Sequence, residues 1–257
     1  MKITLGKNGT RQIRDSKGRI INNLPKSYPV AKPRLPHRNV KVRQREENGG
    51  IAKYMPSKSA LFSALEKMYD EEQAKLLRIY EGAGQGAVRE ATGDLHESMI
   101  DLLIGLMPNY TSTQGTADYL ERKVVTATGE ILKEDNIQVD RHIKKNGEYY
   151  AFIEAKTYLD ASFLSRAVGD LAKIWKSLKQ TKGIAHANRM HYIVFVGQDA
   201  ISENKRKILQ AEFFEMTGCE MKIFCVEEGK RTSKKPLYKN KFLLNEKTVN
   251  SFLDIFV

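Results

Sequence analysis

The stretch from Asn136 to Lys156 has the pattern of one β-hairpin, and it limits the possible folds more than any other part of the chain. Asn146-Gly147 separates two strand-like stretches, and this dipeptide is typical of tight hairpin turns. The second stretch is apolar over 149–153 and ends in Glu154-Ala155-Lys156. An apolar strand of this kind needs a sheet to bury it. We therefore expect a hairpin inside a larger sheet, with Asp140 on its first strand.

The length of the turn decides whether the two acidic residues of this hairpin share a face. With a two-residue turn, Asp140 lies opposite Ile153 and faces away from Glu154, because directly opposed residues share a face. With a three-residue loop over 145–147, Asp140 lies opposite Phe152, and Glu154 becomes a diagonal neighbour about 7 Å away. A site that uses both carboxylates therefore predicts the three-residue loop, or a bulge with the same effect.

Asp140, Glu154 and Lys156 suit one kind of chemistry. Carboxylate oxygens bind hard divalent ions such as Mg²⁺. A lysine two residues beyond a glutamate on a strand lies on the same face, about 7 Å along it. This arrangement favours metal-assisted attack of water on a phosphodiester. The spacing alone leaves a second interpretation open, in which two exposed carboxylates and a surface lysine decorate an ordinary hairpin.

Context must select among several Glu-x-Lys triplets. Glu203 falls in a helical pattern, Glu228 in a turn, and Glu121 in a polar stretch. Glu220 begins a strand, but a helix precedes that strand. Only Glu154 ends an apolar strand with an aspartate upstream, so it is the selected candidate. The five triplets are Glu121-Arg-Lys123, Glu154-Ala-Lys156, Glu203-Asn-Lys205, Glu220-Met-Lys222 and Glu228-Gly-Lys230.

Positive charge is concentrated at the start of the chain. The formal net charge is +12, and residues 1–47 hold thirteen Lys or Arg against three acidic residues, together with four of the seven prolines. A proline-spaced basic stretch cannot build a core, but it can lie along polyphosphate and displace counterions. We expect residues 1–50 to form an arm that contacts DNA and residues 51–257 to form the core domain. A solvated tail is the alternative, and the pattern around 13–21 suggests a small hairpin.

Several other classes of protein are disfavoured. No apolar run is long enough to span a bilayer, and no secretory signal opens the chain. Cys219 and Cys225, the only cysteines, lie in or beside an apolar strand pattern and lack histidines at zinc-site spacing. We expect buried thiols in a reducing compartment, and hence a cytoplasmic protein without membrane contact.

Helical patterns precede the hairpin. Ser57 or Ser59 is suited to cap a helix over 58–80, and Gly82–Gly86 is expected to end it. A second helix is expected over 85–107. One of its stripes is acidic, and four like charges on one helix face repel one another. A solvated face explains this stripe, unless one member leans over the metal site. The stripe consists of Glu90, Asp94, Glu97 and Asp101.

The remaining patterns alternate between strand and helix after a polar loop at 108–115. This order predicts an α/β (α+β) fold, in which a mixed central sheet is flanked by helices. The unbroken apolar run at 191–196 suits a buried central strand. The expected elements are a strand over 123–128, the hairpin, a helix over 161–180 ended by Gly183, the strand at 191–196, a helix over 203–216, a strand over 219–227 and a helix over 245–256.

An aspartate on one strand and Glu-x-Lys on the next, within this order of elements, resembles the PD-(D/E)xK nuclease superfamily. The stretch Ile153–Asp160, running into a helix, looks most like Type II restriction endonucleases. The resemblance covers roughly residues 85–200 and implies a restriction-endonuclease-like core. Val139 stands where the family motif has proline before the aspartate.

The resemblance implies a role for each candidate residue. Asp140 and Glu154 would coordinate Mg²⁺, with the backbone carbonyl of Ala155 completing the shell, and Lys156 would orient or help deprotonate the attacking water. Many members also use a glutamate on the helix before the sheet, sometimes as Gly-x-x-x-Glu. Gly93-Asp-Leu-His-Glu97 has that spacing, so Glu97 is preferred among the acidic residues of its helix.

The histidines offer no competing catalytic arrangement. No Ser, Cys or His nucleophile constellation stands out in the sequence. His96 is expected on the helix surface, and His142 is expected to have an ordinary surface or supporting role.

The leading hypothesis is a Mg²⁺-dependent, sequence-specific DNA endonuclease that makes double-strand breaks. Two identical subunits can cut both strands of a palindromic site, so a homodimer is expected. The family resemblance also implies a companion DNA methyltransferase, not as a bound subunit. A structure-specific or repair nuclease and a non-catalytic nucleic-acid-binding protein are the alternatives. The residues that read bases stay open among the loops at 108–118, 181–190 and 229–241.

Overall fold

The computed structural model describes residues 2–5, 11–14, 20–24, 55–229 and 242–256. The chain separates into two compact units, one made of Met1–Ala52 with Glu81–Ala83 and the other of Lys53–Tyr80 with Gly84–Val257. The first unit contains an antiparallel sheet in which β2 pairs with both β1 and β3. Pairing of β2 with β3 agrees with the hairpin predicted around 13–21. These strands are β1 (Lys2–Leu5), β2 (Arg11–Arg14) and β3 (Ile20–Leu24).

The second unit is built on a five-stranded mixed sheet in the order β10-β9-β8-β7-β4. The three strands β8, β9 and β10 run parallel, whereas β7 and β4 are antiparallel to their neighbours. The predicted mixed α/β architecture is therefore confirmed at this level. The strands are β4 (Tyr110–Gln114), β7 (Arg141–Lys145), β8 (Glu148–Leu159), β9 (His191–Asp199) and β10 (Met221–Cys225).

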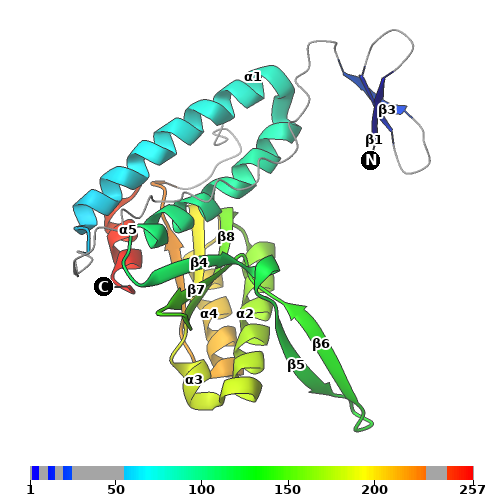
Figure 1. Ribbon diagram of the computed structural model, residues 1–257, viewed down its shortest axis with the longest axis vertical. Coiled ribbons are helices and arrows are strands. Elements are labelled where there is room, and N and C mark those ends of the chain that lie inside the picture. Colours follow the sequence, from blue (N-terminus) through cyan, green and yellow to red (C-terminus); the bar gives the residue numbers. More distant parts are fainter. Residues whose placement is uncertain (1, 6–10, 15–19, 25–54, 230–241, 257) are drawn as a thin grey trace, which may run out of the picture. The chain divides into compact units, whose positions relative to one another are not determined.

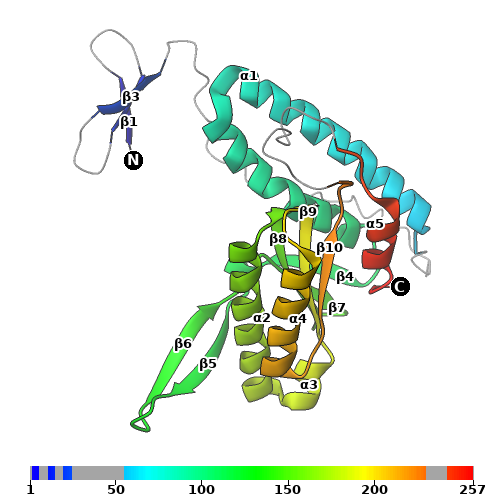
Figure 2. The same cartoon turned by 180° about the vertical axis from the view of Figure 1, so that it is seen from behind.

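Helices cover both faces of this sheet (Figures 1 and 2). Alternate residues of β8 separate the two layers: Phe152 packs with α2 and α4, and Ile153 packs with α1 and α5. This alternation follows from the two-residue period of a strand. The helices are α1 (Lys58–Gly105), α2 (Ala161–Lys182), the short α3 (Ile184–Asn188), α4 (Glu203–Thr217) and α5 (Glu246–Leu253).

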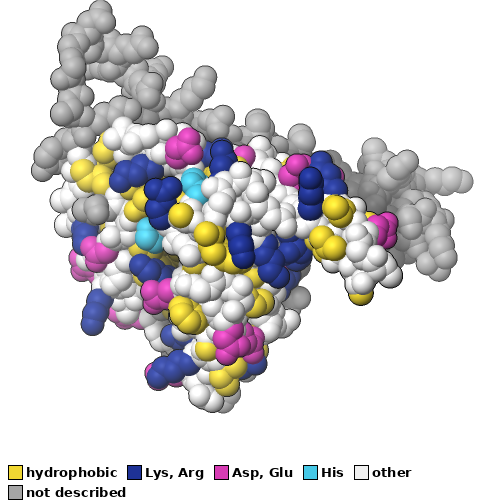
Figure 3. Space-filling model, turned by 90° about the horizontal axis from the view of Figure 1, so that it is seen from below, with side chains coloured by type: hydrophobic (Ala, Val, Ile, Leu, Met, Phe, Trp, Pro, Cys, Tyr) yellow, Lys and Arg dark blue, Asp and Glu magenta, His cyan; other side chains and the backbone are white. Residues whose placement is uncertain are grey.

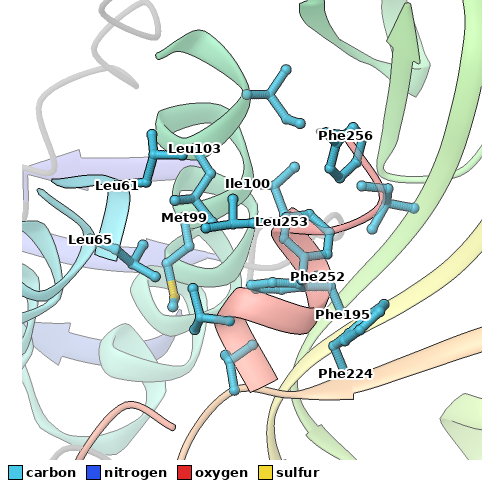
Figure 4. Close-up of a cluster of buried hydrophobic side chains, with 14 of the residues drawn as sticks. Leu61, Leu65, Met99, Ile100, Leu103, Phe195, Phe224, Phe252, Leu253 and Phe256 are labelled. Carbon is cyan, nitrogen blue, oxygen red and sulfur yellow. The ribbon is translucent and has the colours of Figure 1, made fainter. Parts of the chain in front are cut away.

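Aromatic side chains fill the layer between the sheet and α5 (Figure 4). The ring of Phe252 lies 4.9 Å from that of Phe195 and 5.5 Å from that of Phe224, both edge to face. Full burial of such a side chain contributes roughly 2 kcal/mol. Leu61 and Met99, from the two halves of α1, belong to the same cluster. The core thus joins α1, the sheet and the C-terminal helix.

Helix α1 differs from the prediction of two separate helices. Ser57 caps it as expected, since its hydroxyl accepts a hydrogen bond from the backbone N–H of Ala60 at 3.2 Å. However, helical hydrogen bonding continues through Gly82–Gly86, so the predicted break is wrong. A glycine costs a helix only about 1 kcal/mol and often marks a kink. Figure 1 shows the axis of α1 turning back near its middle.

Two strand predictions also need correction. The loop predicted at 108–115 contains the edge strand β4, whose Tyr-Thr-Ser-Thr-Gln sequence is polar but partly β-branched. The strand predicted at 123–128 is β5 (Leu120–Val125), which pairs with β6 (Ile131–Ile137) in a separate two-stranded sheet. Asp140 lies between β6 and β7, directly before a strand instead of within one.

The separate hairpin is fastened to α2. The side chain of Gln180 bonds both backbone groups of Lys123 at 2.8 Å, and the hydroxyl of Ser177 donates to the carbonyl of Glu121 at 2.5 Å. The side-chain amide of Gln180 therefore makes the two hydrogen bonds to β5 that a neighbouring strand would make. Among the described residues, no helix combines the length and apolarity needed to cross a membrane.

Candidate active site

The turn of the β7–β8 hairpin has two residues. Asn146 and Gly147 both have positive φ, 53° and 86°, and Lys145 lies opposite Glu148. Left-handed conformations at both central positions match the twist of a tight hairpin. The predicted three-residue loop is therefore wrong.

A bulge in β8 then brings the carboxylates onto one face. Lys144 lies opposite Tyr149, but Ile143 lies opposite Ala151, so Tyr150 is an extra residue in β8. Beyond the bulge the register continues to Arg141 opposite Ile153. One further residue along this register places Asp140 opposite Glu154. The alternative prediction, that a bulge shifts the register, is confirmed.

Aromatic packing explains why the bulge is stable at this point. The ring of Tyr150 lies 5.3 Å from that of Tyr110 and 5.8 Å from that of Phe256. Its hydroxyl donates a hydrogen bond to the carbonyl of Ile255 at 2.5 Å. The side chain of the extra residue is thus fixed between β4 and the end of the chain. Bulges are common next to functional sites because they re-aim side chains.

The backbone around Asp140 is held by several hydrogen bonds. Its carbonyl accepts from Arg141 Nη1 at 2.8 Å and from the N–H of Gly115 at 3.3 Å. Its carboxylate Oδ2 accepts from the N–H of Ala155 at 2.7 Å. A Cβ atom at Gly115 would lie 1.9 Å from the carbonyl oxygen of Val139, so only glycine permits this approach. Asp140 is therefore positioned before any ligand binds.

Burial raises the pKa of both carboxyl groups of the pair. Glu154 is only 7% exposed, and burial, followed by the charges of Asp140 and Asp170, raises its pKa. Burial also raises the pKa of Asp140, although hydrogen bonds from Ala155 and Glu154 oppose this change. Two carboxylates that share a buried site favour either a shared proton or a bound cation.

This pair fits a Mg²⁺ ion with few protein ligands. In the part of the chain that the structure describes, no group of three or more His, Cys, Asp or Glu side chains is placed to hold a metal. Mg²⁺ is usually held by one or two carboxylates together with water and substrate phosphates. Asp140 and Glu154 supply that number, and the carbonyl of Ala155 stays a predicted third ligand. A bound cation would stabilise the ionised form of each acid and so lower its raised pKa.

Lys156 lies on the same face of β8 as Glu154, two residues further along the strand. Its ammonium nitrogen lies 5.4 Å from the centre of the Phe163 ring. Phe163 belongs to the first turn of α2, so the lysine reaches toward the helix that follows the strand. The structure thus keeps the three residues of the predicted motif on one face.

Glu97 lies near this group but has a different partner from the predicted metal. Its carboxylate accepts from Arg141 Nη1 at 2.6 Å, and Asp101 accepts from Nε and Nη2 of the same guanidinium at 2.7 and 2.9 Å. Burial raises the pKa of Glu97, and the nearby charge of Asp140 adds to this effect. Two members of the acidic stripe of α1, Glu97 and Asp101, therefore bind Arg141, so these two do not simply form a solvated face.

Three charged residues around the pair were not predicted from the sequence. Arg141 follows Asp140 directly, is 2% exposed, and links β7 to α1. Arg166 and Asp170 of α2 both act electrostatically on Glu154. With Phe163 they have the spacing i, i+3, i+7, which marks one helix face. That spacing was a usable signal, whereas the role of Arg141 depends on how α1 packs.

The two histidines near these elements are buried. His96 is fully buried, contrary to the predicted surface position, and its Nε2 lies 3.1 Å from Glu227 Oε1. His142 is also fully buried, and its Nε2 accepts from the N–H of Val139 at 3.4 Å, beside Asp140. Burial lowers the pKa of His142. A supporting role for His142 therefore fits, and a surface role does not.

No family model matches the chain, and no curated protein matches it. The function must accordingly be inferred from the residues and their geometry. The strongest indication is the buried Asp140–Glu154 pair, because the strand register sets the two residues opposite each other and the pKa of both is raised.

Proposed function

We propose that this protein is a Mg²⁺-dependent DNA endonuclease of the PD-(D/E)xK type, and that it cuts both strands at specific sites as Type II restriction enzymes do. One observation carries the proposal: the bulge in β8 sets Asp140 against Glu154 on one face, where burial raises the pKa of both acids. Lys156, on the same face, completes the motif.

The chain's own residues would divide the work in the following way. Asp140 and Glu154 hold the cation, and the hydrogen bond from Ala155 to Asp140 fixes the first of them. When bound, Mg²⁺ stabilises charge on the phosphate and lowers the pKa of water. Lys156 orients the attacking water. The water oxygen forms a bond to phosphorus and loses a proton to bulk water, while the ester P–O bond breaks and bulk water supplies a proton to the departing oxygen.

Plasmid digestion tests this proposal directly. With Mg²⁺, the wild-type chain is expected to give discrete, reproducible fragments from a set of plasmids that together contain every short palindromic sequence. Asp140→Asn and Glu154→Gln are expected to lose cleavage by at least about 100-fold while still binding DNA, because they remove the cation's ligands and not the basic arm. Glu130→Gln, in the exposed turn between β5 and β6, is the matched control.

The same assay separates the alternatives. Cleavage confined to branched DNA would favour a structure-specific or repair nuclease with the same site. Intact plasmid in Mg²⁺ and Mn²⁺, with no effect of Asp140→Asn on any property, would favour a non-catalytic binding protein. The proposed homodimer predicts twice the molar mass of one chain in light scattering at the concentrations used for cleavage.

A further inference from the structure

Two cationic side chains make cation–π contacts with the same buried aromatic ring near the carboxylate pair. Arg166 Cζ lies 5.7 Å and Lys156 Nζ 5.4 Å from the centre of the Phe163 ring. Phe163 is 3% exposed, and its N–H donates to the side chain of Asp160, the N-cap of α2, at 2.7 Å. The start of α2 is thus fixed, and so is the ring that carries both cations. A cation–π contact favours these positions without using the N–H donors of either side chain.

Arg166 differs in its bonding from the other arginine of the site. The guanidinium of Arg141 is buried and donates hydrogen bonds to Glu97, Asp101 and a backbone carbonyl. Arg166 is exposed, and within the described ranges no carboxylate lies within 4.0 Å of its guanidinium. Its charge nevertheless acts on both Asp140 and Glu154. Arg166 is therefore close enough to act on the acidic pair, and no carboxylate of the described residues occupies its donors.

We propose that Arg166 is the phosphate ligand of this site and holds the non-bridging oxygens of the DNA phosphate that is cut, while Lys156, on the same ring, orients the attacking water. This inference rests on the proposed function. A planar guanidinium presents five donors in a fork that matches phosphate oxygens. The carboxylate pair would bind Mg²⁺, and Arg166 on Phe163 would bind the phosphate group that Mg²⁺ must approach. Charge that develops on the phosphoryl oxygens during attack then meets a positioned donor.

Cleavage kinetics give the first test. Arg166→Gln is expected to lower single-turnover plasmid cleavage in Mg²⁺ by about 100-fold, as for other donors to developing negative charge. Arg166→Lys should restore part of this loss, because it keeps the charge but not the fork. Lys176→Gln is the control: Lys176 is exposed on the same helix, about 15 Å further along, and should stay within about twofold of wild type.

Binding gives a second test that needs no cleavage. For a random-sequence duplex in Ca²⁺, the slope of log affinity against log salt concentration should fall by about 1 in Arg166→Gln, the value for one lost phosphate contact, and should not change in Lys176→Gln. Stabilisation of the folded chain by Mg²⁺ alone should be the same in Arg166→Gln as in wild type. That readout separates a phosphate ligand from a residue that only supports the metal site.

Each outcome decides the inference. Wild-type cleavage and an unchanged salt slope in Arg166→Gln would overturn it, and so would a loss of the Mg²⁺ effect in that variant. If the wild-type chain itself cuts no DNA, the proposed nuclease function fails. In that case the salt slope still shows whether Arg166 contacts phosphate.

Discussion

At the scale of single residues, Asp140 and Glu154 make the folded chain sensitive to pH in an unusual direction. An acid whose pKa is raised by folding binds more protons in the folded state than in the unfolded state between its ordinary and its raised pKa. The free energy of unfolding therefore falls as pH rises through that window. Most acidic residues in proteins act in the opposite direction, since their folded pKa is lowered.

Glu154→Gln should accordingly be more stable than wild type at pH 8 without metal. Each tenfold change in proton affinity corresponds to about 1.4 kcal/mol, so we expect a gain of about 1–3 kcal/mol. The gain should shrink toward pH 4, where the unfolded acid is also protonated. Urea denaturation at both pH values measures the difference.

Mg²⁺ supplies a linked readout for the same variant. It should raise the unfolding midpoint of wild type at pH 8, because a ligand that binds only the folded state stabilises it. It should not raise that of Glu154→Gln, and Glu130→Gln should behave like wild type. A Glu154→Gln chain that loses stability at pH 8 would show that the carboxylate is satisfied without a cation.

The motif residues were predictable from sequence, but their partners were not. Glu154 and Lys156 follow an apolar strand, and a strand fixes which residues share its face. The bulge at Tyr150 was foreseen only as one of two ways to align Asp140, because its cause is packing against Tyr110 and Phe256. Both of these residues come from elements distant in sequence, so no local pattern reports the contact.

At the scale of elements, Arg141 ties β7 to the second half of α1. Arg141→Met should lower the free energy of unfolding by about 2 kcal/mol, because it leaves Asp101, and Glu97 with the nearby charge of Asp140, without their counter-charge. Arg122→Met is the control. Its side chain pairs with Glu134 at 2.6 Å on the β5–β6 hairpin, and we expect a loss of less than about 1 kcal/mol.

Replacing the two acids in the Arg141→Met background completes this test. Adding Glu97→Gln and Asp101→Asn should recover part of the lost stability if repulsion near Asp140 is the cause. No recovery would mean that lost packing of the arginine stem dominates. Urea denaturation of Arg141→Met, of the Glu97→Gln/Asp101→Asn variant and of the combined variant measures the coupling.

Elements that depend on local patterns were predicted well, and those that depend on partners were not. Helix α2 begins and ends near its predicted limits, because Asp160 caps it and Gly183, at φ 90°, terminates it. Strand β4 was taken for a loop, because a polar edge strand gains its stability from pairing with β7. The glycines of α1 were predicted to end the helix. Local propensity does not include the packing of both halves of α1 into one core, which stabilises the continuous helix.

At the scale of the whole chain, the excess positive charge and the candidate active site lie in different segments. Residues 1–47 carry a net charge of +10, whereas the rest of the chain carries only +2. On the face shown in Figure 3, lysines and arginines alternate with acidic and apolar side chains instead of forming one broad basic patch. If the proposed function is correct, the general attraction to DNA should therefore come mainly from residues 1–47, and cleavage from the core.

Deleting residues 1–47 should separate these two properties. Each phosphate contact contributes about 0.9 to the slope of log affinity against log salt concentration, so the truncated chain should bind duplex DNA more weakly and with a flatter slope. Stabilisation by Mg²⁺ should survive, because Asp140 and Glu154 belong to the other compact unit.

A full-length chain with the thirteen basic residues of 1–47 replaced by Gln should behave like the deletion if charge is responsible. Wild-type affinity at low salt in both chains would remove the arm from DNA binding, and would assign that binding to the core, with Arg166 and Lys156 as its first candidates.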